Sequence, residues 1–251
     1  MADDGGSDIS HEPRTKPLDL LPGANVRPVR NLEDAFKWVQ HALEKVPPET
    51  IVKRCCDRLV TTSGAFYGVG APEVADRCIA HGITKFLAGR PNSNASSYVA
   101  PPHFKNSWAI EISGACRAEM LEDVDGPSHV FGDICDFLPP RWRQRCGLDA
   151  GTRWPIERLC KELPRVKLLT SAYCYKCAKT CDAEATFLHR AGSPCVNHSP
   201  MGDRKMEKGD MFHLYLVWVA LVRTLRFKHL VHENVTAFGK ASTSAHRFER
   251  C

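Results

Sequence analysis

The segment from residue 193 to 235 constrains the fold more than any other, because it combines a loop, a helix and a strand. It starts with a thiol directly after a proline, Pro194-Cys195, among small and polar residues. Residues 211–225 then have helix length and a mostly apolar face. The run HLVHENV that follows is typical of a buried strand leading into a loop at Glu233. In a parallel α/β sheet, such a thiol and carboxylate would both reach the carboxyl edge, where these sheets bind ligands.

Upstream of this unit, short apolar runs alternate with turns. The sequence predicts strands near residues 59–62, at 108–111 and near 129–132, with a helix over about 72–80 after the first. This alternation predicts an α/β fold built on a doubly wound, mostly parallel sheet.

Candidate ligand-binding residues follow each of the three upstream strands. Phe66, Gly68 and Gly70 lie in a glycine-rich turn, where a missing side chain allows close approach of the backbone to a ligand. Glu111 ends the second apolar run, at the position where doubly wound sheets hold ribose hydroxyls. Asp133 follows the third. Taken alone, Glu111 is also typical of a surface acid, and Asp133 of a turn residue or a helix cap.

Five segments in order resemble the C5 cytosine-specific DNA methyltransferases. They are SGAFYGVGAPE, WAIEISGACRAEML, FGDICDF, GSPCVNHSPMG and LVHENV, and together they cover about residues 59–238. In that family, a Pro-Cys loop supplies the nucleophile and a Glu-Asn-Val tripeptide supplies the acid. The chain departs from the family pattern at Ala71, where a third glycine is frequent, and at Val196, where a glutamine commonly follows the cysteine.

The resemblance implies a Rossmann-like fold of the S-adenosylmethionine-dependent methyltransferase type, S-adenosylmethionine as cofactor and cytosine-containing DNA as partner. It implies that Cys195 attacks C6 of cytosine while Glu233 assists at N3. It places Pro194, Asn234 and Val235 beside the substrate base. The implied cofactor contacts are Phe66, Gly68, Gly70, Glu111, Asp133 and Ile134.

Composition agrees with one α/β domain. The chain has 251 residues, 43% hydrophobic and 25% charged, with a formal net charge of +5. Basic residues concentrate after residue 140, where Arg141, Arg143 and Arg145 surround Trp142. Such a patch suits contact with phosphates, but it is equally typical of a solvated helix start after two prolines.

Twelve cysteines raise the question of disulfides, yet residues 1–14 are acidic and polar and lack the pattern of a secretion signal. The sequence therefore predicts a reducing compartment, the nucleus in a eukaryote and otherwise the cytoplasm, and a protein that is not secreted. The most apolar run, residues 211–222, is too short to span a bilayer, so no membrane segment is expected.

Three of these cysteines form a local cluster, Cys174, Cys177 and Cys181. The first two have the spacing of metal ligands, but no second pair or nearby histidine clearly completes a set of four. Cys160 or His189 could serve as the fourth ligand. On a helix, the three thiols would share one face, and we expect buried thiols rather than a metal site.

The predicted organisation has three parts. Residues 1–30 are expected to form a disordered tail, and residues 31–48 an amphipathic helix and linker stopped by Pro47-Pro48. Residues 49–251 are expected to form the partial methyltransferase catalytic domain, with insertions at about 82–106 and 139–187.

The C-terminal part of the family pattern has no counterpart, because only a short segment follows Val235. The chain is therefore expected to be the cofactor-binding and catalytic half of such an enzyme, with a partner chain as one source of the missing half. Two alternatives stay open. One is an RNA cytosine-5 methyltransferase of the same fold, and the other is a truncated, non-catalytic cofactor-binding module.

Overall fold

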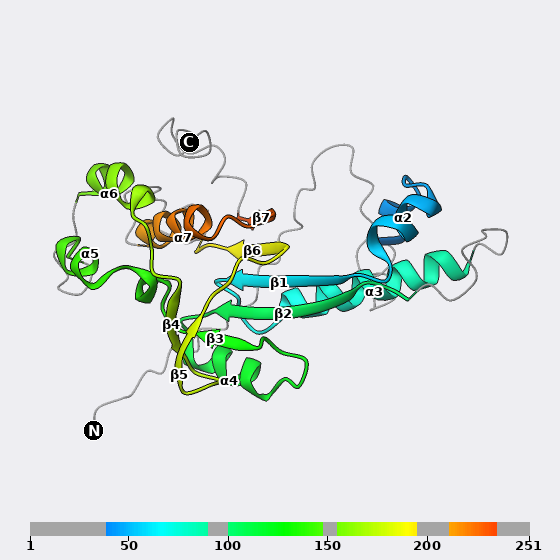
Figure 1. Cartoon of the computed structure of the whole chain (residues 1–251), viewed down its shortest axis with the longest axis horizontal. Coiled ribbons are helices and arrows are strands. Elements are labelled where there is room, and N and C mark those ends of the chain that lie inside the picture. Colours follow the sequence, from blue (N-terminus) through cyan, green and yellow to red (C-terminus); the bar gives the residue numbers. More distant parts are fainter. Residues whose placement is uncertain (1–38, 90–99, 148–154, 195–210, 235–251) are drawn as a thin grey trace, which may run out of the picture.

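The computed structural model of the chain describes residues 39–89, 100–147, 155–194 and 211–234. Its centre is a seven-stranded sheet of order β5-β4-β3-β2-β1-β6-β7 (Figure 1). Five of these strands pair in parallel: β1 (Leu59–Ala65), β2 (His103–Ile110), β3 (His129–Phe131), β6 (Leu188–Gly192) and β7 (His229–Glu233). The hairpin of β4 (Ser171–Cys174) and β5 (Lys179–Asp182) is antiparallel. The predicted α/β fold with a mostly parallel sheet is confirmed.

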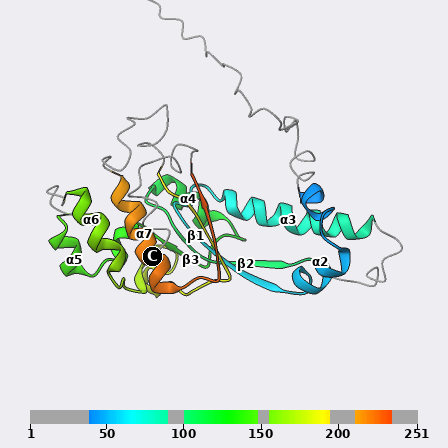
Figure 2. The same cartoon turned by 90° about the horizontal axis from the view of Figure 1, so that it is seen from above.

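Helices connect the parallel strands and cover both faces of the sheet. On one side are α3 (Ala71–Ala88), between β1 and β2, and α4 (Gly114–Glu122), between β2 and β3. On the other side α7 (Phe212–Leu225), between β6 and β7, packs with α6 (Ile156–Glu162), η2 (Ile134–Phe137) and η3 (Leu163–Arg165). In both views, α5 (Pro140–Arg145), α6 and α7 lie at one end, and α2 (Pro48–Cys55) and α3 lie at the other (Figures 1 and 2).

The apolar end of β2, Trp108 to Ile110, is buried on both faces of the sheet. In β2, Trp108 and Ile110 pack with α7, whereas Ala109 between them packs with Met120 of α4 on the opposite face. Successive side chains of a strand point to opposite faces, so one short apolar run supplies two cores.

The strand order reverses at β1. The chain builds β2 and β3 on one side of β1 and later returns to place β6 and β7 on the other side. This reversal makes the boundary between β1 and β6 the switch point of the sheet, and ligands of open α/β folds bind at the carboxyl ends of such strands.

The predicted insertion over residues 82–106 is wrong at both of its ends, and its residues 90–99 lie outside the described ranges. The helix predicted over 72–80 continues to Ala88, and β2 begins at His103 rather than near residue 108. The start of β2 is polar because it pairs with the start of β1 from Leu59 onward, beyond the stretch where β3 and β6 join the sheet. Because this two-stranded ribbon has no further strand on either side, its side chains are less buried, and few of those at the start of β2 are apolar.

The N-terminal helix is described only in part. Residues 39–43 are helical and the helix ends before Pro47, as predicted, whereas residues 1–38 lie outside the described ranges. Pro48 also starts a new helix, α2, which the sequence reasoning missed; proline is well tolerated in a first helical turn.

Two further expectations need correction. β7 is an edge strand with His229, Leu230 and Val231 exposed, so the prediction of a buried strand at HLVHENV is wrong. Part of the predicted insertion over 139–187 belongs to the central sheet, because its β4–β5 hairpin extends the sheet beyond β3. No disulfide joins any two of the ten cysteines in the described ranges. Among the described residues, no helix has the length and apolarity to cross a membrane.

Candidate functional site at the carboxyl edge of the sheet

The turn after β1 has an unusual backbone. Phe66, Gly68 and Gly70 all have positive φ, at 56°, 64° and 88°. Such a conformation is costly for a bulky residue such as Phe66, and strain of this kind gathers at functional sites. A Cβ placed on Gly68 would meet no atom within 4 Å, so the space beside this turn is open. Gly70 then leads into the N-terminus of α3.

Glu111 fastens this turn to the end of β2. One carboxylate oxygen accepts a hydrogen bond from Gly68 N at 2.8 Å, and the other accepts one from Ser113 N at 2.8 Å. Each carboxylate oxygen has a further lone pair, so Glu111 keeps acceptor capacity for hydroxyl donors of a ligand. The structure thus brings Gly68 and Glu111 together as the sequence predicts, and it adds a clamping role for the acid.

Asp133 lies at the end of the neighbouring strand, β3. Its Oδ1 accepts a hydrogen bond from Cys135 N at 2.8 Å and caps η2, as the helix-cap alternative for this residue predicts. This bond occupies only one carboxylate oxygen of a half-buried side chain. Ile134 is 2% exposed and packs in the main core, so it can reach a ligand only through its backbone. Glu111 N donates to Phe131 O, which places Glu111 next to the end of β3.

The ends of β6 and β7 are tied directly together. Asn234 Nδ2 donates to Ser193 O at 3.1 Å and to Ser193 Oγ at 2.8 Å. Ser193 Oγ also lies 2.8 Å from His232 Nε2. Ser193 and Pro194 lead into Cys195, and Asn234 follows Glu233 in the chain. The first residues of the Pro-Cys loop are therefore anchored beside the Glu-Asn-Val tripeptide.

Glu233 reaches across the end of β6 towards the switch point. It pairs in register with Gly192, and a Cβ built on Gly192 would lie 3.4 Å from Glu233 Oε2 and 4.0 Å from Phe66 O. The described residues therefore gather the acid, the strained turn after β1 and the base of the Pro-Cys loop at one edge. Cys195 and Val235 lie outside the described residues, and their roles stay predictions.

An ion pair holds the start of α3 at this edge. Arg190 of β6 donates to both carboxylate oxygens of Asp76, at 2.8 and 2.9 Å, and to Pro72 O. Burial raises the pKa of Asp76, and the Arg190 guanidinium opposes that rise. The pair directs the N-terminus of α3 towards the switch point, and helix N-termini favour negatively charged groups of ligands.

Below the switch point, His189 joins β6, β1 and α7. It is fully buried, and Trp218 Nε1 donates to its Nε2 at 3.0 Å while its Nδ1 lies 2.9 Å from Ser63 Oγ. Burial lowers the pKa of His189 to about 3, with a smaller contribution from Arg190. An indole N–H can only donate, so the neutral ring carries its proton on Nδ1 and donates to Ser63.

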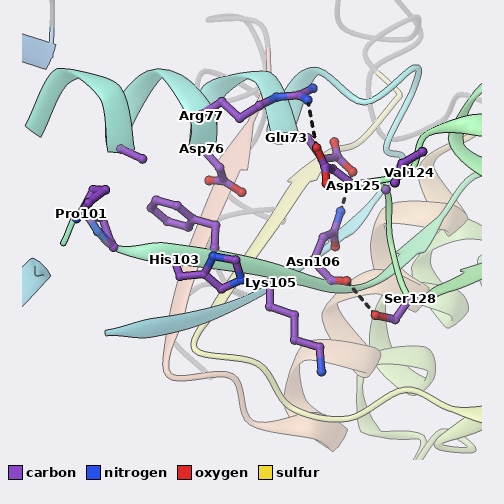
Figure 3. Close-up of a pocket in the computed structure, with 14 residues that line it drawn as sticks. Glu73, Asp76, Arg77, Pro101, His103, Lys105, Asn106, Val124, Asp125 and Ser128 are labelled. Atoms are coloured by element: carbon purple, nitrogen blue, oxygen red, sulfur yellow. Dashed lines mark hydrogen bonds and ion pairs between the residues drawn. The ribbon is translucent and has the colours of Figure 1, made fainter. Parts of the chain in front are cut away.

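A cavity of about 490 Å³ lies away from this edge, between α3, the start of β2 and the loop before β3 (Figure 3). Asn106 donates to Glu73 Oε1 inside it, and burial raises the pKa of Glu73. None of the predicted site residues lines this cavity. We place the candidate site at the carboxyl edge instead. The strained turn after β1, the Glu111 carboxylate bonded to that turn, and the hydrogen-bonded ends of β6 and β7 all lie there.

The basic patch and the cysteine cluster predicted from the sequence make contacts within the fold. Arg143 pairs with Asp136, and the Arg145 guanidinium lies 5.1 Å from the centre of the Trp142 ring. Cys174, Cys177 and Cys181 come together on the β4–β5 hairpin rather than on a helix, with His129 as a fourth member. The suggestion of His189 as their partner is wrong, because both of its ring nitrogens are used in the core, and Cys160 is not in the group.

Sequence reasoning missed two residues at the strand ends. Ile112, directly after Glu111, is 60% exposed, and an apolar side chain there could cover the flat face of a ligand ring. The sequence could have indicated Ile112, because it is an apolar residue among polar and small residues directly after a predicted strand. His129 was missed because its partnership with the cysteines depends on strand pairing.

No protein-family model matches the chain, and no curated protein matches it.

Proposed function

We propose that the chain is a cytosine-5 methyltransferase that acts on DNA, with S-adenosylmethionine as methyl donor and Cys195 as nucleophile. One observation carries the proposal: the hydrogen bonds from Asn234 to Ser193, which join the loop leading to Cys195 to the strand end bearing Glu233. Covalent attack on cytosine needs a thiolate and an acid at one base, and these two motifs supply them.

The parallel strands support the methyltransferase type of fold. Their spatial order is β3-β2-β1-β6-β7, with the switch point between β1 and β6. The candidate donor-binding residues follow the first three, and the candidate catalytic residues follow the last two. This division would bring the methyl donor and the target base together at the switch point.

The donor set fits S-adenosylmethionine. The half-buried Glu111 carboxylate suits ribose hydroxyls, and the second oxygen of Asp133 suits an exocyclic amino group. The open space at Gly68 leaves room beside the turn. When bound, S-adenosylmethionine supplies a methyl group as an electrophile.

The protein's own residues then have two tasks. As the Cys195 Sγ–C6 bond forms, Glu233 donates a hydrogen bond or proton to N3 of the base, and C5 becomes nucleophilic. Methylation at C5 leaves S-adenosylhomocysteine. Solvent then takes the C5 proton, N3 returns its proton or hydrogen bond to Glu233, and cleavage of the Sγ–C6 bond restores the ring and releases the thiolate. The base must leave its stack to reach these groups, as for other enzymes that do chemistry on bases.

The test is a duplex carrying 5-fluorocytosine, incubated with the full chain and S-adenosylmethionine. Fluorine at C5 blocks the final proton loss, so we expect a covalent protein–DNA adduct that resists denaturing electrophoresis. Cys195→Ala should abolish the adduct, and Glu233→Gln should slow its formation by about a hundredfold or more. Cys55→Ala, a half-buried thiol on α2, is the matched control and should form adduct at the wild-type rate.

The outcomes separate the candidate functions. If an RNA of the same sequence carrying 5-fluorocytosine forms the adduct and the DNA duplex does not, the activity belongs to RNA cytosine. An adduct that survives Cys195→Ala would refute the nucleophile. A folded chain that binds S-adenosylmethionine but forms no adduct with either polymer would refute catalysis and leave a cofactor-binding module.

A further inference from the structure

A second cluster of reactive side chains lies at the far edge of the sheet from β7. It contains His129 at the start of β3, Cys174 at the end of β4, Cys177 in the hairpin turn and Cys181 in β5. One ligand atom from each of the four lies within 4.8 Å of all the others. The hairpin that carries the three thiols crosses the end of the sheet beside β3 (Figure 1).

The distances match a tetrahedral centre. With zinc–sulfur and zinc–nitrogen bonds of about 2.3 and 2.0 Å, tetrahedral angles put a histidine nitrogen about 3.5 Å from each thiolate. His129 Nδ1 lies 3.4 Å from Cys177 Sγ and 3.8 Å from Cys174 Sγ. A lone imidazole N–H cannot serve both sulfurs equally as a hydrogen-bond donor, whereas one metal ion can be bound by all three groups.

The local backbone has the form of a metal-binding turn. Cys174 and Cys177 are separated by two residues, and Ala178 after them has a φ of 53°, which turns the chain back into β5. Val130 N donates to Cys174 Sγ at 3.4 Å. N–H donors aimed at a sulfur favour thiolate, which is the form that binds metals.

Burial and chemistry favour a closed site. Cys174 and Cys181 are buried, and His129 and Cys177 are half-buried. Three thiolates and one imidazole form one of the usual ligand sets of structural zinc, with no position left for water. A hard cation such as Mg²⁺ or Ca²⁺ would need oxygen ligands, which this set does not contain.

We propose that His129, Cys174, Cys177 and Cys181 bind one zinc ion that fastens the β4–β5 hairpin to β3. The hairpin needs such a fastening, because β3 and β4 share only the register pair Phe131 and Cys174. The zinc proposal does not rest on the proposed methyl transfer, since the cluster contains none of the proposed catalytic or cofactor-binding residues.

The turn also carries Tyr175 towards the candidate site. Tyr175 N donates to Val130 O at 2.7 Å, and a Cβ on Gly132 would lie 3.0 Å from the Tyr175 ring. The Arg117 guanidinium lies 4.3 Å from the centre of the same ring and also donates to Glu111 O. A metal in the hairpin would thus steady the residues around Asp133 and Glu111 as well as the edge of the sheet.

The test measures metal directly in the full chain. After expression with zinc and extensive dialysis, we expect about one zinc per chain by elemental analysis. Cobalt(II) exchanged into the site should give the intense visible bands of tetrahedral coordination and thiolate-to-cobalt charge transfer. Cys177→Ser and His129→Asn should each reduce zinc content and change these bands. Cys55→Ser and His103→Asn, which alter a thiol and an imidazole outside the cluster, should keep both.

Cys177 is half-buried in a turn, so Cys177→Ser tests the site with little risk to folding, and circular dichroism checks that the variant folds. Wild-type zinc content in a folded Cys177→Ser would overturn the proposal. Folded wild-type protein that takes up neither zinc nor cobalt would overturn it as well. Mass spectrometry of protein purified under nitrogen without added reductant provides a third check, because a disulfide between Cys174 and Cys177 would assign the cluster to redox chemistry instead.

Discussion

Buried His189 should make the stability of the fold strongly dependent on pH. The ring is neutral in the fold, with a pKa lowered from 6.5 to about 3 by burial. In the unfolded chain it binds a proton below pH 6.5. The unfolded state therefore holds more protons between these two values, so the contribution of His189 is complete above pH 6.5 and is lost as the pH falls towards 3.

The magnitude follows from this difference in pKa. Each pKa unit corresponds to about 1.4 kcal/mol, so the loss is about 4 kcal/mol at pH 3 and about 2 kcal/mol between pH 7 and pH 5. The second range is the useful one, because 2 kcal/mol is a large part of the stability of an ordinary domain.

The perturbation is His189→Gln. A glutamine side chain can still accept from Trp218 and donate to Ser63, but it does not titrate. Urea unfolding followed by tryptophan fluorescence at pH 7 and pH 5, at constant ionic strength, gives the free energy of unfolding for each protein. Between these pH values, the wild type should lose about 2 kcal/mol more than the variant. Contributions from other titrating groups, including the proposed metal ligands, are common to both proteins and cancel in this comparison.

The matched control is His103→Gln, which changes an exposed histidine at the start of β2 and should keep the wild-type pH dependence. An equal loss of stability by wild type and His189→Gln between pH 7 and pH 5 would show that His189 does not have a lowered pKa in the fold. A pKa of His189 near 6.5, measured by NMR in the folded protein, would show the same independently.

Two further predictions concern the start of α3 and the end of β3. Arg190→Met should lower the free energy of unfolding by about 3–5 kcal/mol, because it leaves the Asp76 carboxylate buried and unpaired. Adding Asp76→Leu should recover part of that loss in urea unfolding, and simple addition of the two single losses would contradict a direct pair. Asp133→Asn should weaken S-adenosylmethionine binding about tenfold or more in calorimetry while keeping the melting temperature, since asparagine still caps η2. Unchanged affinity in this variant would remove Asp133 from the cofactor site.

The strand ends could be predicted because each is marked by an apolar run that stops at a polar or glycine residue. Glu111, Asp133 and Glu233 were found in this way, and all three lie at the carboxyl edge. Such a pattern depends only on neighbours in the chain. It does not say which hydrogen bonds an acid makes, so the clamp from Glu111 to the glycine turn appears only in three dimensions.

Long-range pairing explains what the sequence did not predict. His129 joins the three cysteines because an antiparallel hairpin docks beside β3, and nothing local to His129 encodes that docking. Sequence spacing suggested a shared helix face for the thiols, but the residues between them form a turn between two strands. The start of β2 was missed for a related reason, since polar residues in a protruding ribbon lack the alternation that identifies a strand.

The switch point between β1 and β6 also has a consequence for the order in which the molecule folds. β1 and β2 are consecutive strands of the chain, whereas the pairing of β1 with β6 joins residues as far apart in sequence as Ser63 and His189. Contacts across such long stretches of chain close late and slowly, because the loop-closure entropy is lost before the contacts form. The edge that would bind S-adenosylmethionine and a target base is therefore completed only when the two halves of the sheet meet. A ligand that bridges β1 and β6 would then bind only the finished fold and would slow its unfolding.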